Sequence, residues 1–301
     1  MLLENWFFLA LLGPLFWTIS DFIDKLVIDN HVTSTVDFLF TFSLTSWFCL
    51  ALLIFIFGVP APSVNAVFAI ALGFSTTLSF YFYALGLKHM DTSLAILTFK
   101  LVPILAILLA FLIFSAPLKL NEIAAALIVA AGALYLFVEL DEGQFTWNKG
   151  MPWMLLAVCM WAVIFVVADH LLNTMTFGEY MVLDTFGASL VTLPLLCFPR
   201  TLKDVVHGIK SARKNKYRWF FLNTFTDFLA QVCLKKSFSL APTVGAVSLV
   251  TQIQSVYGII AGVLLTVCWP SVFSENISKE NITKKIIGSV IIASGIAIAL
   301  I

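Results

Sequence analysis

Long apolar runs, separated by short polar breaks, fill this chain from end to end. Between residues 81 and 137 three such runs follow one another, with polar breaks only at 88–91 and 115–122. An apolar run of about 20 residues is the length that an α-helix needs to cross the hydrocarbon core of a bilayer. In lipid the backbone polar groups must be satisfied within the chain, which favours helices for runs of this length. The pattern therefore predicts a bundle of membrane-spanning helices.

The composition also points to a lipid environment. Of the 301 residues 61% are hydrophobic and 11% are charged, whereas soluble domains are about 25% charged. The formal net charge is +0, which argues against nucleic acid as a partner because nucleic-acid-binding proteins carry a basic field. The 5 cysteines fall in or beside apolar runs and follow neither a disulfide nor a zinc pattern. The first apolar run lacks the features of a signal peptide, so we expect it to be a membrane span.

Counting apolar runs of this length gives about ten spans. We expect them at residues 6–28, 38–57, 64–87, 92–114, 123–138, 151–172, 177–198, 219–234, 243–268 and 285–301. The second half weakly repeats the first, since residues 240–246 correspond to residues 89–95. Two similar halves of five spans must lie upside down relative to each other, because five is odd. We therefore predict an all-α polytopic membrane protein of two inverted five-helix repeats, residues 1–140 and 141–301.

Three short segments carry a resemblance to a known family. They are YALGL at 83–87, TSLA at 92–95 with Pro103 after it, and AGAL at 131–134. In these segments the chain resembles the EamA-type members of the drug/metabolite transporter superfamily. The resemblance implies a ten-helix transporter with an EamA-like repeat in each half and with both termini in the cytoplasm.

The distribution of positive charge gives the opposite orientation. Most of the 17 Lys and Arg residues fall in loops that follow odd-numbered spans, and the positive-inside rule places such loops in the cytoplasm. Both termini would then lie outside, so the orientation stays open. The longest of these loops, residues 199–218, carries the pattern of a short amphipathic helix lying on the membrane.

Motifs for catalysis or cofactor binding are missing from the sequence. There is no His-Glu-x-x-His, no Gly-x-Ser-x-Gly and no phosphate-binding glycine loop with a lysine. The 4 histidines are scattered over span ends and loops, where solvation explains them better than metal binding. We expect no enzyme activity, no cofactor and no metal, and transport that is either facilitated or coupled to an ion gradient.

Lys100 is the strongest single indication of a functional site. It lies about 12 Å from the polar edge at Asp91, near the middle of a bilayer core about 30 Å thick. A charge at that depth marks either a functional site or a structural ion pair. The spacing of Lys100 and Pro103 is similar to a midmembrane lysine motif of some nucleotide-sugar carriers in the same superfamily. That similarity implies a substrate with an anionic group.

Acidic residues also fall inside predicted spans, and three of them are candidates for the site. Asp227, Asp184 and Asp21 are expected either to couple transport to protons or cations, or to form ion pairs inside the bundle. Lys100 and Asp227 come from different halves and should lie at the same depth. We expect them to be energetically linked.

Aromatic and polar residues complete the predicted cavity. Trp17 and Trp161 hold related positions in the two halves, and with Tyr81 we expect them to pack the organic body of a substrate, with helix packing as the alternative. A polar stripe on the ninth span is expected to face the cavity, although such stripes also hold helices together. The stripe consists of Ser248, Thr251, Gln252 and Ser255. Gln252 is expected to hydrogen-bond the substrate.

These observations predict a secondary or facilitative transporter. It would move a small polar organic metabolite, such as an amino acid, a purine or another organic ion, by alternating access around a midmembrane cavity. A membrane-embedded lipid-modifying enzyme and a non-transporting scaffold are the alternatives. The expected partners are the small-molecule substrate and the lipid bilayer, with coupling to protons or to an exchanged metabolite. We expect a monomer or homodimer in the inner membrane of a bacterium.

Overall fold

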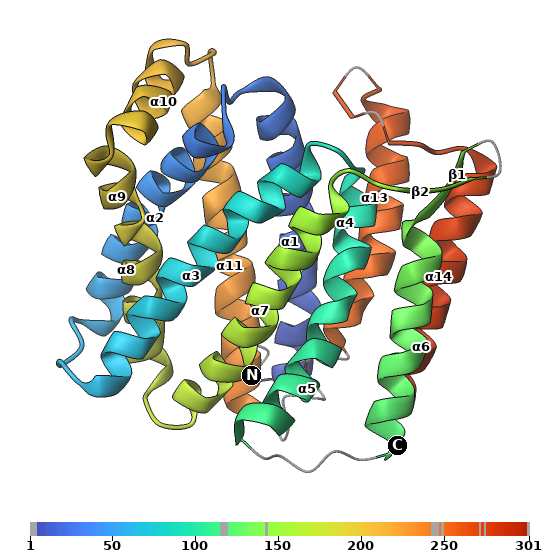
Figure 1. Ribbon diagram of the computed structural model, residues 1–301. Helices are drawn as coiled ribbons and strands as arrows, with labels where there is room; N and C mark the ends of the chain where they lie inside the picture. The colour runs from blue at the N-terminus through green and yellow to red at the C-terminus, as the bar shows by residue number, and fades with distance from the viewer. Residues whose placement is uncertain are drawn as a thin grey trace.

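Long helices packed side by side make up almost all of the computed structural model (Figure 1). The structure describes residues 5–114, 120–141, 144–241, 247, 250–270, 272–273 and 275–299. The first half contributes α1 (Trp6–Asn30), α2 (Thr35–Phe57), α3 (Val64–Leu87), α4 (Thr92–Thr98), the 3-10 turn η2 (Phe99–Leu101), α5 (Val102–Phe114) and α6 (Leu120–Phe137). The second half contributes α7 (Met151–Leu172), α8 (Phe177–Leu190), α9 (Thr192–Cys197), α10 (Pro199–Lys210), α11 (Lys216–Leu240), the 3-10 turn η3 (Thr251–Ile253), α13 (Gln254–Cys268) and α14 (Lys279–Ala299).

A short hairpin joins the two halves. Its strands β1 (Val138–Asp141) and β2 (Gln144–Trp147) pair in antiparallel fashion. Most of this stretch lies between the expected spans 123–138 and 151–172, where no strand was predicted. The predicted class, an all-α polytopic membrane protein, is confirmed, with this hairpin as a small addition.

Polar residues just before the apolar runs fix where several helices begin. The side chains of Asn5, Ser34 and Ser63 accept hydrogen bonds from backbone N–H groups in the first turns of α1, α2 and α3. Thr176 and Glu179 form a capping box at the start of α8. These caps satisfy N–H groups that have no partner inside a helix, which sets the helix ends in sequence.

Six of the described helical segments are long and apolar enough to cross a membrane, judged by length and composition. They are Trp6–Asn30, Thr35–Phe57, Val64–Leu87, Thr92–Ile113, Met151–Leu172 and Phe177–Cys197. α11 has 25 residues but too many polar side chains to meet the same criterion. Those side chains are inside the bundle, since Asn223, Asp227, Gln231 and Lys235 are all buried. The predicted count of ten spans stays a prediction.

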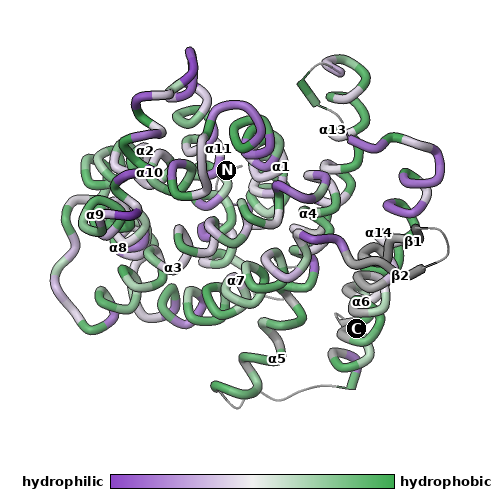
Figure 2. Tube along the Cα trace, turned by 45° about the horizontal axis from the view of Figure 1, so that its top comes forward, coloured by the Kyte–Doolittle hydropathy of each residue, from purple (hydrophilic) through white to green (hydrophobic). Residues whose placement is uncertain are grey.

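The two ends of the bundle differ in polarity. The start of α1 and the end of α14 lie at one end, as an even number of spans predicts (Figure 1). The connections α1–α2, α3–α4 and α13–α14 lie at the other end together with α10, and hydrophilic residues gather there (Figure 2). On α10, Leu202, Val206 and Ile209 are exposed while Val205 and Gly208 are buried against the bundle. The predicted amphipathic helix therefore exists, and its place on the membrane surface stays a prediction.

Helices of the first half pack mainly on helices of the second. α1 packs along α11, α3 packs on both α7 and α8, α2 packs on α8, and α6 packs on α14. Glycines bring α3 and α8 backbone to backbone, since a Cβ on Gly73 would lie 1.7 Å from the carbonyl oxygen of Asp184. A Cβ on Gly187 would likewise lie 1.9 Å from the carbonyl oxygen of Ile70. These close contacts hold polar residues of the two helices next to each other.

Two 3-10 turns lie just before helices beside the cavity, α5 and α13. The 3-10 turn Phe99–Leu101 separates α4 from α5, and the 3-10 turn Thr251–Ile253 precedes α13. The two turns hold equivalent positions in the two halves, if the halves are aligned by the weak sequence repeat. Both turns lie beside the cavity described next.

Candidate functional site

A cavity of about 80 Å³ lies in the middle of the bundle, between α1, α3, α4, α7, α11 and α13. Aromatic rings and ionisable side chains share its wall. The lining residues are Trp17, Ser20, Asp21, Asp24, Phe80, Tyr83, Ile96, Phe99, Lys100, Val102, Trp161, Phe165, Asp227, Thr251 and Gln254. We call this cavity the central pocket.

Lys100 reaches the central pocket from the 3-10 turn η2. Its side chain is 3% exposed, and its Nζ donates a hydrogen bond to Oε1 of Gln254 at 3.1 Å. The same amide of Gln254 donates through Nε2 to Oδ2 of Asp21 at 3.1 Å, and Tyr83 donates to Oδ1 of Asp21 at 3.1 Å. One neutral amide from the second half thus bridges an ammonium and a carboxylate of the first half.

The other two carboxylates of the pocket are also held by neutral donors. Asn223 donates through Nδ2 to Oδ1 of Asp24 at 2.6 Å, and the amide oxygen of Asn223 accepts from Ser20 at 2.8 Å. Trp17 donates through Nε1 to Oδ1 of Asp227 at 3.1 Å. Among the described residues no ion pair joins Lys100 to any carboxylate. The pocket therefore places three carboxylates around one ammonium without pairing them directly.

Aromatic side chains form a continuous wall beside these charges. Trp161, which is 6% exposed, makes edge-to-face contacts with Trp17, Phe80 and Phe165 at ring-centroid distances of 6.2, 6.1 and 5.5 Å. Its ring also lies 6.4 Å from that of Phe99. Such contacts fix ring orientations and leave an apolar surface for a flat or aliphatic body.

The structure gathers most of the residues predicted for the site. Trp17, Trp161, Lys100, Asp21, Asp227 and Thr251 all line the central pocket. Lys100 and Asp227 share the pocket, but each has a different hydrogen-bond partner, Gln254 and Trp17. Ser248 and the side chain of Gln252 lie outside the described residues. Their predicted roles stay predictions.

Two predicted residues lie elsewhere. Tyr81 packs on Phe82, with ring centroids 5.6 Å apart, and does not line the pocket. Asp184 lines a neighbouring cavity and forms an ion pair with Lys235 at 2.5 Å. Tyr83 holds the pocket position expected for Tyr81, because residues two apart on a helix point in nearly opposite directions.

Four polar pocket residues were not among the predicted site residues. They are Ser20, Asp24, Tyr83 and Gln254, with Asn223 behind them. Asp24 could have been found from Asp21, since residues three apart lie on one face of a helix. Gln254 could have been found in the same way from Thr251 on the ninth span.

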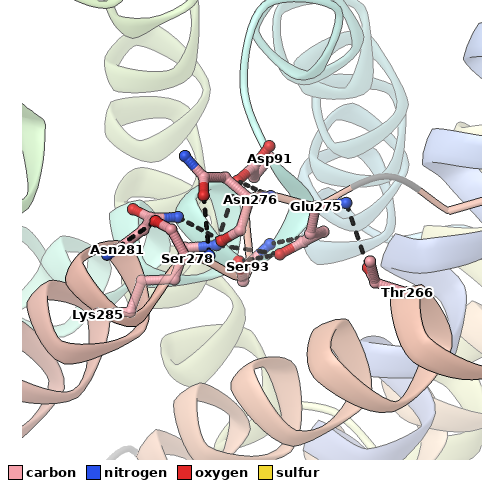
Figure 3. A network of polar contacts seen from close by, with 8 residues as sticks. All are labelled: Asp91, Ser93, Thr266, Glu275, Asn276, Ser278, Asn281 and Lys285. Carbon is pink, nitrogen blue, oxygen red and sulfur yellow. Dashed lines mark hydrogen bonds and ion pairs between the residues drawn. The ribbon is translucent and has the colours of Figure 1, made fainter. Parts of the chain in front are cut away.

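A network of polar contacts joins the start of α4 to α14 and to the connection before it (Figure 3). Glu275, in the connection before α14, accepts the backbone N–H of Ser93 at 3.0 Å and also the Ser93 hydroxyl. Lys285 contacts Glu275 at 3.1 Å and Asp91 at 3.2 Å, and the backbone N–H of Glu275 donates to Thr266 at 3.2 Å. Asp91 makes no capping hydrogen bond to α4 through its side chain. Glu275 therefore caps the helix that carries Lys100, from the other half of the chain.

Comparison with known proteins identifies the family of the first half. Residues 4–138 match the EamA-like transporter family. The first half of the chain is EamA-like. The resemblance to the drug/metabolite transporter superfamily seen in the sequence is thereby confirmed.

Two further similarities agree with this result. An "Uncharacterized transporter" of Archaeoglobus fulgidus is 28% identical to this chain over 116 residues, which are 37% of this chain and 41% of that protein. The aligned region thus spans less than half of the relative. A protein of known crystal structure matches with a TM-score of 0.58 over 97% of this chain and 96% of that chain, at 17% identity. At that identity the match shows the fold alone.

The apolar helices indicate an integral, multi-pass membrane protein, and the family that residues 4–138 match is a family of transporters. Among the described residues, the central pocket is the cavity that combines several charges with an aromatic wall.

Proposed function

We propose that this EamA-like protein is a secondary or facilitative transporter that carries a small polar organic metabolite bearing an ammonium group. Amino acids, amines and protonated purines belong to this class. The observation that supports it is the central pocket, where three carboxylates and one lysine stand against a wall of aromatic rings. Substrate sites of secondary transporters lie near the bilayer midplane between two halves, and residues of both halves line this pocket.

The charge balance of the pocket favours a cationic group on the cargo. Asp21, Asp24 and Asp227 outnumber Lys100, and each carboxylate is held only by neutral donors. Uncompensated negative charge inside a low-dielectric bundle is unfavourable. An ammonium group near Asp227 would relieve it, and the neighbouring rings of Trp17 and Trp161 would add cation–π attraction.

Lys100 would bind the end of the cargo opposite the ammonium group. Its ammonium has one described acceptor, Gln254, although an ammonium has three N–H donors. A carboxylate on the cargo would offer a second acceptor, which makes zwitterions a better fit than simple cations. The anionic group implied by the lysine motif is thus kept, as one end of a zwitterion.

Alternating access is the proposed mechanism, with residues 1–140 and 141–301 as inverted repeats. The packing supports it, because α1 on α11 has its counterpart in α3 on α7. If α1 corresponds to α7 and α3 to α11, the contact between α1 and α11 and the contact between α3 and α7 are equivalent under the repeat. The network of Glu275, Lys285 and Asp91 would close one end and would have to open during transport.

The wider setting is part of the same proposal. The protein would act in the inner membrane of a bacterium, as a monomer or homodimer, with transport coupled to an ion or to an exchanged metabolite. A lipid-modifying enzyme or a scaffold would show no solute movement, so one experiment separates the three classes.

The test is uptake into proteoliposomes that contain the purified full chain. The panel holds labelled neutral amino acids, amines, purines and dicarboxylates. We expect uptake of one or more compounds that bear an ammonium group, lowered at least tenfold by Asp227→Asn. Asp204→Asn, on the surface helix α10, is the matched control and should transport normally. Uptake of dicarboxylates alone would contradict the charge argument, and a folded protein that moves no compound would contradict the transporter.

A further inference from the structure

A second, smaller cavity of about 40 Å³ adjoins the central pocket, between α2, α3, α8 and α11. Phe80 and Asp227 line both cavities. The remaining wall is polar for a membrane interior, with Thr76, Thr77, Asp184, Thr224 and Gln231 among its residues. We call this cavity the side chamber.

Two side chains in the side chamber lack the hydrogen bonds that burial normally demands. Gln231 is 7% exposed, and both polar atoms of its amide have no hydrogen-bond partner among the described residues. Thr77 is 0% exposed, and its hydroxyl also has none. Leaving a buried polar group unsatisfied costs about 1–3 kcal/mol. Groups of this kind in a native cavity indicate a ligand or water that completes them.

The charges that face the side chamber leave one negative charge uncompensated. Asp184 pairs with Lys235 at 2.5 Å and accepts from the Tyr180 hydroxyl at 3.3 Å. Asp227 has only Trp17 as a described hydrogen-bond donor of ordinary length, with the Gln231 amide beside it on the next turn of α11. The charged groups that face Asp227 across the central pocket are Asp21, Asp24 and Lys100, and the thiol of Cys49 faces it from α2. A bound cation would balance the negative charge that remains on Asp227.

Size and ligand type restrict which cation fits. A buried water needs about 10–15 Å³, so 40 Å³ leaves room for about three waters or for a small ion with one or two waters. A proton needs a single carboxylate oxygen and would leave the amide and the hydroxyl unsatisfied. A divalent ion would bring more charge than the one free carboxylate balances, and no cluster of three or more His, Cys, Asp or Glu lies among the described residues.

We propose that the side chamber is a sodium-ion site, formed by the carboxylate of Asp227, the amide oxygen of Gln231 and the hydroxyl of Thr77. Hard oxygen ligands around one uncompensated carboxylate are the surroundings that a small alkali cation prefers. Ion sites of secondary transporters also lie at midplane depth beside the substrate. If the proposed transport function holds, sodium and the ammonium group of the cargo both draw on Asp227, which links the two movements.

The site itself can be tested without any transport substrate. The melting temperature of the purified full chain in detergent is measured while NaCl replaces N-methylglucamine chloride or KCl at constant ionic strength. A ligand that binds only the folded state raises stability as its concentration passes Kd, so we expect a saturable rise of about 2–5 °C with sodium alone.

Matched variants locate the effect. Thr77→Val and Gln231→Leu should abolish the sodium-dependent rise, while Thr77→Val should melt no lower than wild type without sodium, since it removes an unsatisfied hydroxyl. Thr76→Val is the control, because the Thr76 hydroxyl already donates to the carbonyl of Leu72 at 3.0 Å. This control variant should keep the rise.

Three results would overturn the proposal. The first is a rise in melting temperature with KCl as large as that with NaCl. The second is a sodium-dependent rise that Thr77→Val and Gln231→Leu leave unchanged. The third is a melting temperature of the wild type that responds to pH alone and that no longer does so in Asp227→Asn. Transport is measured only after this binding test. The measurement is the uptake, driven by a sodium gradient, of a compound that the panel has shown to be transported. A sodium-dependent rise without any uptake would support the site and contradict the transporter, so the two failures remain distinct.

Discussion

The end of the bundle opposite the termini, which holds the connections α1–α2, α3–α4 and α13–α14, is called the loop-rich end here (Figure 1). The charged side chains at this end and those in the central pocket have different kinds of partner. At the loop-rich end Lys216 and Asp37 form a fully buried pair at 2.5 Å, and Lys285 contacts both Asp91 and Glu275. In the central pocket Lys100 and the carboxylates make hydrogen bonds only to neutral groups such as Gln254. Paired charges satisfy each other and hold helices together, whereas charges held by neutral groups remain available to a ligand. The comparison thus separates structural charges from proposed functional ones.

The largest effect should follow from breaking the buried pair. Lys216→Met leaves Asp37 buried without its partner, and removal of one partner of such a pair destabilises a protein by about 3–5 kcal/mol. We expect a large drop in melting temperature, which the double variant Asp37→Leu with Lys216→Met should largely restore. Asp29→Asn is the control, because the Lys25–Asp29 pair at 3.4 Å is exposed and should contribute at most about 1 kcal/mol. Similar losses for both pairs would contradict the comparison.

A smaller effect should reveal how the pocket charges are connected. The amide of Gln254 links Lys100 to Asp21, so a double-mutant cycle of Lys100→Met with Asp21→Asn should show about 0.5–3 kcal/mol of coupling. The cycle of Lys100→Met with Asp227→Asn should be closer to additive. Both cycles are measured on melting temperature and on uptake. Stronger coupling to Asp227 would restore the direct link between halves that the sequence predicts.

The network at the loop-rich end should affect access more than stability. Glu275→Gln weakens the contacts to Lys285 and Ser93, worth about 0.5–1.5 kcal/mol for each hydrogen bond. A cysteine in place of Ser20, in a background without other cysteines, should then react about three- to tenfold faster with a water-soluble reagent. Asn281→Ala, in the same region, serves as the control. An unchanged reaction rate would show that the network does not close this end.

The smallest effect concerns a histidine at the loop-rich end. Burial, with the positive charges of Arg213 and Lys216 nearby, lowers the pKa of His31. The folded protein then binds fewer protons than the unfolded chain, so stability decreases as the pH falls through the ordinary histidine value of about 6.5. His31→Gln should reduce the loss of melting temperature between about pH 7 and pH 5. A steeper loss in the variant would reverse the sign of this argument.

Much of the fold could be predicted because lipid imposes simple rules on sequence. Apolar runs of the required length gave the helices, and the isolated charge of Lys100 pointed to the central pocket. The rotation of each helix about its axis was harder to predict from the sequence, because the lipid-facing and protein-facing surfaces of a membrane helix are both apolar. Tyr81 was therefore preferred to Tyr83, and Gln254 was not predicted.

Ion pairs between residues that are distant in sequence were the second feature that the sequence did not predict. The pairing of Asp184 with Lys235 and that of Asp37 with Lys216 join helices far apart in sequence. Neither pair follows a helical spacing, so no local pattern could indicate it. For this reason the sequence left open whether Asp184 couples transport or forms an ion pair, and the structure shows the ion pair with Lys235.

The two 3-10 turns beside the central pocket have a mechanical consequence. A tight turn inside a helix has weaker hydrogen-bond geometry than the α-helical turns around it, so bending concentrates there and the turn acts as a hinge. Phe99–Leu101 and Thr251–Ile253 provide one hinge in each half, both at the wall of the cavity. If the halves are inverted copies, bending one hinge while the other straightens produces a state that is related to the starting state by the pseudo-two-fold axis in the membrane plane and has similar free energy. The cargo would then sit between two hinges, and a small difference in its contacts would decide which one bends.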